Sequence, residues 1–211
     1  MIEGDFKFAF VAFTAVFFVV DPFAAIPIFV TITAGDDAAR RRVLALRASL
    51  ATFVTLTAFS LAGGLIFQLF GISLAAFKIA GGLMLLLMAF DMMRAQPSRT
   101  RSTAEEEEEG KVKDDVAIVP MAIPILAGPG AIATCMVLMS RTAWRPVPVL
   151  MVLGAITLTT LVTWLILRSA ASAQRFLSRT FLHVMSRVMG LLLAAVAIEF
   201  MIGGLKEVWP R

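Results

Sequence analysis

The sequence predicts an all-α membrane protein of six transmembrane helices, built as two inverted three-helix repeats in which helices one and four are broken. Composition, the lengths of the apolar segments and two pairs of prolines lead to this fold class. Hydrophobic residues make up 59% of the 211 residues, charged residues only 16%, and the mean hydropathy is +0.88. These values lie outside the range of soluble globular domains, so the expected partner of most of the surface is the lipid bilayer.

Six apolar segments are long enough to cross about 30 Å of hydrocarbon, which needs about 20 helical residues. They cover roughly residues 8–34, 43–70, 72–93, 116–140, 147–167 and 181–205. Glu3 and Asp5 precede the first segment, where a cleavable signal peptide would carry basic residues. We therefore expect this segment to remain in the mature protein.

A polar stretch at residues 96–115 separates two halves, residues 1–95 and 116–211, with three segments each. It contains an unbroken acidic run from Glu105 to Glu109. Like charges at this density repel one another and favour an extended, solvated chain. We interpret the stretch as a cytoplasmic linker, and a regulatory or partner-binding segment is the alternative.

The two halves resemble each other in sequence. Pro22 and Pro27 match Pro124 and Pro129 with a shift of 102 residues (124 minus 22). The third segment, from Lys78, matches the sixth with a shift of 109 residues (187 minus 78). Because each half has an odd number of spans, the halves would cross the membrane in opposite senses, as in the inverted repeats of many secondary transporters.

Lysine and arginine are distributed unequally between the two sides of the predicted membrane protein. The connections after segments one, three and five carry 13 of the 19 basic residues, and the opposite side carries the other 6. Since basic residues stay preferentially in cytoplasmic loops, both termini are predicted to lie outside the bacterial inner membrane. The net charge of +4 is thus a topology signal, and we predict no nucleic-acid partner.

The proline pairs predict a break in the first and in the fourth helix. A proline inside a helix removes one backbone donor and clashes with the preceding turn. Lipid cannot hydrogen-bond the freed backbone groups, so such breaks persist only where they are buried in protein or line a polar cavity. In transporters they typically form the substrate site.

Asp21 lies deep in the first segment, directly before Pro22. An ionised carboxylate at this depth costs about 2.5–3.5 kcal/mol on insertion scales unless it faces a cavity or a partner. Asp21 is therefore a candidate for ion coupling or substrate binding. The alternative is a helix cap alone, because aspartate accepts backbone amides at helix starts and proline favours the next position; the two roles are compatible.

At the second break, Gly128, Pro129 and Gly130 permit a close backbone turn. A half-helix that starts there would point its unsatisfied amides and positive dipole end into the bundle, where they can bind a carboxylate. Thr31 and Thr134 follow the two breaks and are candidates for hydroxyl contacts to a substrate, although membrane threonines more often bond their own backbone. Glu199, in the sixth segment, is a second candidate for ion coupling or else an interfacial residue.

The residue types present argue against metal, cofactor and enzyme chemistry. Cys135 and His183 are the single cysteine and histidine, which leaves too few ligands for a metal site. No nucleotide-binding loop and no intramembrane protease motif is present. We predict no cofactor and no enzymatic activity.

The segment Asp-Pro-x4-Pro in helix one, the run from Pro124 to Ala131 in helix four and the glycines of helices three and six resemble the MarC family of bacterial inner-membrane proteins. The resemblance spans nearly the whole chain. It implies a SnatA-like transporter of small neutral amino acids. It also implies a site at the two breaks, formed by Asp21, Pro22, Pro27, Pro124, Gly128, Pro129 and Gly130.

The leading hypothesis is a secondary transporter of small neutral amino acids or similar zwitterions, driven by a proton or sodium gradient, with import and export equally open. A channel or an exporter of another small solute is the alternative. The apolar outer faces can pack against lipid or against another copy of the chain, so a homo-oligomer is possible.

Overall fold

The computed structural model describes residues 2–33, 35–94, 126–173 and 179–209. Within these ranges the secondary structure is helical, without a strand. The helices are α1 (Ile2–Val20), α2 (Pro22–Ile32), α3 (Ala38–Phe70), α4 (Leu74–Met93), α6 (Pro129–Arg141), α7 (Pro146–Ala173) and α8 (Arg179–Val208).

Five of the predicted spans are present as helices long and apolar enough to cross a membrane. They are Phe6–Ile32, which comprises most of α1 and all of α2, Ala38–Phe70, Leu74–Met93, Pro146–Ala170 and Val184–Val208. Of the predicted fourth span, only the second half is described, as the 13-residue helix α6. The linker at residues 96–115 and the site candidate Pro124 lie outside the described residues.

Local sequence signals account for where several helices begin and end. The Asp37 carboxylate accepts a hydrogen bond from the Arg40 amide (2.7 Å), and the Ser73 hydroxyl accepts one from the Ala76 amide (3.1 Å). These are the N-caps of α3 and α4, and they satisfy amides that have no partner inside the helix. Gly71 ends α3 with a φ of 61°, a left-handed conformation that glycine adopts at little cost.

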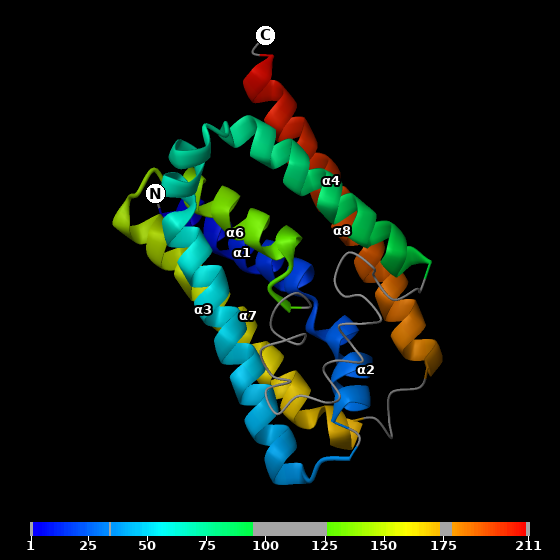
Figure 1. Ribbon diagram of the computed structural model, residues 1–211. Coiled ribbons are helices and arrows are strands. Elements are labelled where there is room, and N and C mark those ends of the chain that lie inside the picture. Colours follow the sequence, from blue (N-terminus) through cyan, green and yellow to red (C-terminus); the bar gives the residue numbers. More distant parts are fainter. Residues whose placement is uncertain (1, 34, 95–125, 174–178, 210–211) are drawn as a thin grey trace.

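The helices form two antiparallel pairs around the shorter helices (Figure 1). α3 packs against α7, and α4 packs against α8. α1 contacts α6 and α7, α2 contacts α7 and α8, and α6 contacts α3 and α4. Both termini, the α3–α4 turn and the α6–α7 turn lie toward the top and upper left of Figure 1, whereas the α2–α3 connection and the far ends of α4 and α7 lie toward the bottom and right.

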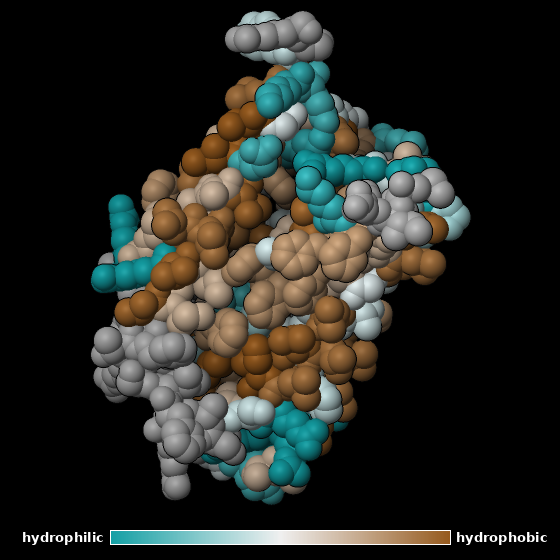
Figure 2. All heavy atoms as spheres, turned by 180° about the vertical axis from the view of Figure 1, so that it is seen from behind, coloured by the Kyte–Doolittle hydropathy of each residue, from teal (hydrophilic) through white to brown (hydrophobic). Residues whose placement is uncertain are grey.

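The burial pattern places α6 in the interior and leaves apolar side chains of the longer helices exposed. Every α6 residue from Gly130 to Met139 except Ile132 is buried. In contrast, α3, α7 and α8 expose large apolar side chains, among them Leu50, Leu161 and Leu191. From behind, apolar residues form a continuous surface across the middle of the molecule, with hydrophilic residues gathered toward its edges (Figure 2). Such a surface suits contact with lipid.

Candidate functional site

The first break consists of a single residue, Asp21, which joins α1 to α2. Its φ and ψ of 47° and 72° lie in the left-handed region, which aspartate tolerates better than most residues. Pro22 favours this interruption because a following proline disfavours the right-handed helical conformation. The Asp21 amide donates to the Phe17 carbonyl (2.9 Å), and its carboxylate accepts from the Ala24 amide (3.2 Å). Asp21 therefore closes one helix and caps the next.

The Asp21 carboxylate lies inside the protein. The residue is 3% exposed, and Pro22, the first residue of α2, is also buried. The predicted unwound stretch between Pro22 and Pro27 is wrong, because α2 continues through Pro27. The Pro27 ring removes one backbone donor, but the Thr31 hydroxyl donates to the Pro27 carbonyl (2.9 Å). Pro27 and Thr31 are both exposed and share one face of α2.

The second break begins α6 with a backbone cap only. Gly128 is the N-cap, with an extended backbone (φ −64°, ψ 169°), and no side chain caps the helix. The Gly128 carbonyl accepts the first helical hydrogen bond, from the Ile132 amide (3.1 Å). Pro129 is the first helical residue, as Pro22 is in α2. The amides of Gly130 and Ala131 thus belong to an N-terminus without a side-chain cap in the buried part of the molecule.

Close packing against α4 explains why position 130 is a glycine. A Cβ added there would lie 2.5 Å from Leu85 Cδ2 and 3.2 Å from Met88 Sδ. The fully buried Thr134 donates its hydroxyl to the Gly130 carbonyl (2.8 Å), one turn earlier in the same helix. The hydroxyls of Thr31 and Thr134 therefore both donate to backbone carbonyls of their own helices, and their oxygens can still accept a hydrogen bond.

The two half-helices run from the middle of the molecule toward opposite ends (Figure 1). α2 leads toward the α2–α3 connection and α6 toward the α6–α7 turn. Their N-termini therefore lie in the middle of the molecule. Because each helix N-terminus carries a partial positive charge, the buried carboxylate of Asp21 is favoured at the start of α2. The start of α6 has the same partial charge without an acidic side chain at its cap.

Glu199 lies on a different surface from these buried residues. It is exposed on α8, whereas Ala197, two residues earlier, packs against Gly82 of α4. Two residues correspond to about 200° around a helix, so Glu199 points away from α4. It precedes Glu207 by eight residues, about 12 Å along the helix axis.

A group of buried hydroxyl side chains on α3 and α7 escaped the sequence-based prediction. Four of them donate to the carbonyl of the residue four positions earlier, at distances of 2.6–3.0 Å: Thr52, Ser60, Thr160 and Thr163. The buried hydroxyls of Ser49 and Thr159 have no hydrogen-bond partner among the described residues. The signal was the spacing of Ser49, Thr52 and Ser60 on one helical face, which the counting of apolar residues did not consider.

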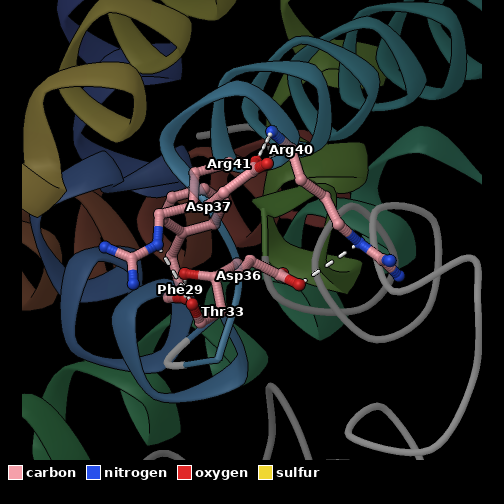
Figure 3. A network of polar contacts seen from close by, with 6 residues as sticks. All are labelled: Phe29, Thr33, Asp36, Asp37, Arg40 and Arg41. Atoms are coloured by element: carbon pink, nitrogen blue, oxygen red, sulfur yellow. Dashed lines mark hydrogen bonds and ion pairs between the residues drawn. The ribbon is translucent and has the colours of Figure 1, made fainter.

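Polar contacts hold the far end of α2 against the start of α3 (Figure 3). The Thr33 hydroxyl donates to the Phe29 carbonyl (2.8 Å), and Arg41 Nε donates to the Thr33 carbonyl (3.0 Å). Arg40 forms an ion pair with Asp36 (3.2 Å). A cationic side chain at a helix C-terminus stabilises the negative end of its dipole. The half-helix that Asp21 begins is thus fixed at its other end too.

A family model described as MarC family integral membrane protein matches residues 6–209, which includes both breaks. The chain belongs to the MarC family. Its resemblance to that family, inferred from the two proline-containing breaks, is confirmed.

Relatives in this family match the MarC chain over nearly its full length. A UPF0056 membrane protein of Methanocaldococcus jannaschii is 37% identical over 202 residues, which cover 96% of this chain and 98% of the relative. The UPF0056 membrane protein YvbG of Bacillus subtilis is 36% identical, covering 97% of each chain. YhcE of Escherichia coli is 35% identical, covering 98% of this chain and 95% of its own. No solved structure matches significantly. Together with the apolar helices, family membership makes the protein an integral, multi-pass membrane protein.

Proposed function

We propose that this protein is a secondary transporter of small neutral amino acids or similar small zwitterions, coupled to a proton or sodium gradient. One observation carries the proposal: two half-helices begin in the middle of the molecule, one at a buried carboxylate and the other at a cap without a side chain. Half-helices of this kind bind substrates and ions in secondary transporters.

The two helix starts complement the two charges of a zwitterion. The substrate carboxylate would bind the amides of Gly130 and Ala131, where the α6 dipole is positive. The substrate ammonium group, or the coupling ion, would bind near the Asp21 carboxylate. Pro22, Gly128 and Pro129 would shape this site, and Pro27, Pro124, Thr31 and Thr134 would contribute to its walls. Little room for a long side chain is expected there, since Leu85 and Met88 press against Gly130.

The inverted repeat belongs to this proposal. Pro22 and Pro129 are each the first residue of a half-helix, a shift of 107 residues (129 minus 22). This shift is closer to the 109 residues that relate the third and sixth segments than is the 102 obtained from Pro22 and Pro124. The packing supports it too, because α2 contacts α7 as α6 contacts α3, and both long pairs are antiparallel.

Glu199 remains a second candidate for ion coupling, since an exposed carboxylate within an apolar span needs water, an ion or a protein partner. We propose the bacterial inner membrane as the location, with both termini outside. A homo-oligomer would cover part of the apolar surface.

Counterflow in proteoliposomes tests the transport function. Vesicles preloaded with unlabelled glycine, alanine or serine should accumulate external tracer to saturation with the native protein. Gly128→Leu should abolish accumulation, because its side chain would occupy the start of α6. Gly64→Leu is the matched control, since Gly64 is exposed and a Cβ there meets no atom within 4 Å. Non-saturating tracer flux would indicate a channel. No flux of any neutral amino acid through folded protein would refute the proposed substrate class.

A further inference from the structure

α4 and α8 form a closely packed pair along their whole length, the most extensive contact between any two described helices. Three glycines allow the backbones to approach. A Cβ added to Gly82 would lie 2.7 Å from the Ala197 carbonyl oxygen, one added to Gly190 would lie 2.9 Å from that of Ala89, and one added to Gly204 would lie 2.7 Å from that of Ala75. Such contacts, with little side chain between them, let membrane helices pack as one unit.

Polar contacts join the pair near both ends. Toward the end of α4, the Ser186 hydroxyl donates to the Met92 carbonyl (3.3 Å). Near its start, the buried Lys78 ammonium group forms an ion pair with Glu207, 129 residues later in the chain. A buried lysine that lost this carboxylate would be an uncompensated charge, so separation of the helices here is unfavourable.

The pair contacts the remaining described helices over smaller areas. α4 crosses α6, where a Cβ on Gly81 would lie 2.8 Å from Ala133 Cβ and Leu85 fills the space beside Gly130. α8 touches α1 and α2 less extensively than it touches α4. The α3–α4 turn provides the covalent link, at Gly71, next to the stacked rings of Phe67 and Phe77 (centroids 4.8 Å apart).

We propose that α4 and α8 move as one rigid body against a second body that contains α1, α3, α6 and α7, with the α4–α6 crossing as the pivot and the Gly71 turn as the hinge. This inference rests on the proposed transport function, for which it identifies the moving parts. The crossing involves glycine, alanine and one leucine, so a small rotation there disturbs few interlocked side chains. It also includes Gly130, so the motion would change access to the start of α6.

Two engineered disulfides, each placed where a γ atom faces a missing Cβ, test the two-body motion in a Cys135→Ala background. The pair Ile79→Cys and Gly204→Cys lies within the first body, since the Gly204 Cβ would be 2.8 Å from Ile79 Cγ1. The pair Leu85→Cys and Gly130→Cys bridges the bodies, since the Gly130 Cβ would be 3.4 Å from Leu85 Cγ. Both separations suit a disulfide after small adjustments. Comparing the oxidised and reduced forms of one variant removes the effect of the substitutions themselves.

Oxidation should change counterflow less than twofold for the bridge between positions 79 and 204. It should reduce counterflow at least tenfold, reversibly, for the bridge between positions 85 and 130. Inhibition by the first bridge, or unchanged counterflow with the second, would overturn the proposal. A third pair, Gly63→Cys and Met136→Cys, joins α3 to α6 within the second body and should resemble the first pair.

Distances between spin labels decide the motion even if no transport is found or the bridged variant folds poorly. Labels on the exposed positions Leu83 of α4 and Leu191 of α8 should give one narrow distance. Labels on Leu83 and Leu161 of α7 should give two populations that saturating alanine or a pH change redistributes. A single, unchanging distance for the second pair would refute the two-body motion. Two populations without any counterflow would retain the motion and refute only the transport function.

Discussion

Asp21 combines three properties that few residues can supply together. Its backbone adopts a left-handed conformation, its carboxylate caps α2 through the Ala24 amide, and the side chain is 3% exposed. Asparagine shares the first two properties, because it tolerates the left-handed region and caps helices as well as aspartate does. Only the negative charge distinguishes the two residues. A carboxylate at this position is therefore better explained by a function of its charge than by capping alone.

Asp21→Asn should separate the cap from the charge. We expect the melting temperature in detergent to change little and gradient-driven transport to be lost, while counterflow persists with altered pH or sodium dependence. Asp21→Ala is the matched control. It should destabilise the protein, by about 1 kcal/mol from the lost cap and by about 1–2 kcal/mol from the left-handed backbone. Unchanged ion dependence in Asp21→Asn would exclude this carboxylate as the coupling group.

Gly130→Ala should destabilise the protein by overpacking. The added Cβ would overlap Leu85 Cδ2 at 2.5 Å, and overpacking of this kind costs about 1–3 kcal/mol. Leu85→Val removes the overlapping carbon, so the double variant should be more stable than the sum of the two single effects predicts. Thermal unfolding of the single and double variants measures this coupling. Additive effects would show that the crossing relaxes without involving Leu85.

At the scale of helices, neighbouring glycines of the same pair do different things. Gly204 faces the Ala75 carbonyl oxygen and the Ile79 side chain, whereas a Cβ on Gly203 would meet no atom within 4 Å. Both glycines read alike in the sequence, as a pair of small residues that permits close helix packing. Only the rotation of α8 about its axis separates them, and the contacts of α8 with α4 determine that rotation.

Gly204→Ala and Gly203→Ala form a matched test of this packing. Gly204→Ala should lower stability by about 1–3 kcal/mol, because a backbone oxygen cannot move aside as a flexible side chain can. Gly203→Ala should leave stability unchanged or raise it slightly, since alanine favours helix. Melting temperatures in one detergent give the comparison. Equal losses would contradict the helix orientation in the structure.

At the scale of the whole molecule, the connections fall into two groups at opposite ends. Both termini, the α3–α4 turn and the α6–α7 turn are on one side, and the arginine-rich connections are on the other (Figure 1). Between them lies an apolar surface (Figure 2). This arrangement agrees with the topology expected from the basic residues, in which the arginine-rich side faces the cytoplasm.

Single-cysteine labelling measures the orientation. Cys135 is fully buried and should not react, so it leaves a clean background. Lys7→Cys and Trp209→Cys should react with a membrane-impermeant maleimide on intact cells, whereas Arg94→Cys should react only after permeabilisation. All three positions are exposed in the protein. Labelling of Arg94→Cys in intact cells would reverse the proposed orientation.

The sequence by itself determined the membrane class, five spans within a few residues, and the presence of both helix breaks. Hydropathy and the missing amide of proline are local properties, so they can be read without knowledge of neighbours. The tertiary structure decided the rest. It limited the first break to Asp21, let α2 continue through Pro27, paired Lys78 with Glu207 and left Glu199 exposed. It also placed the Ser and Thr side chains of α3 and α7 inside. These outcomes depend on which helix faces which, and contacts between residues far apart in the chain determine that.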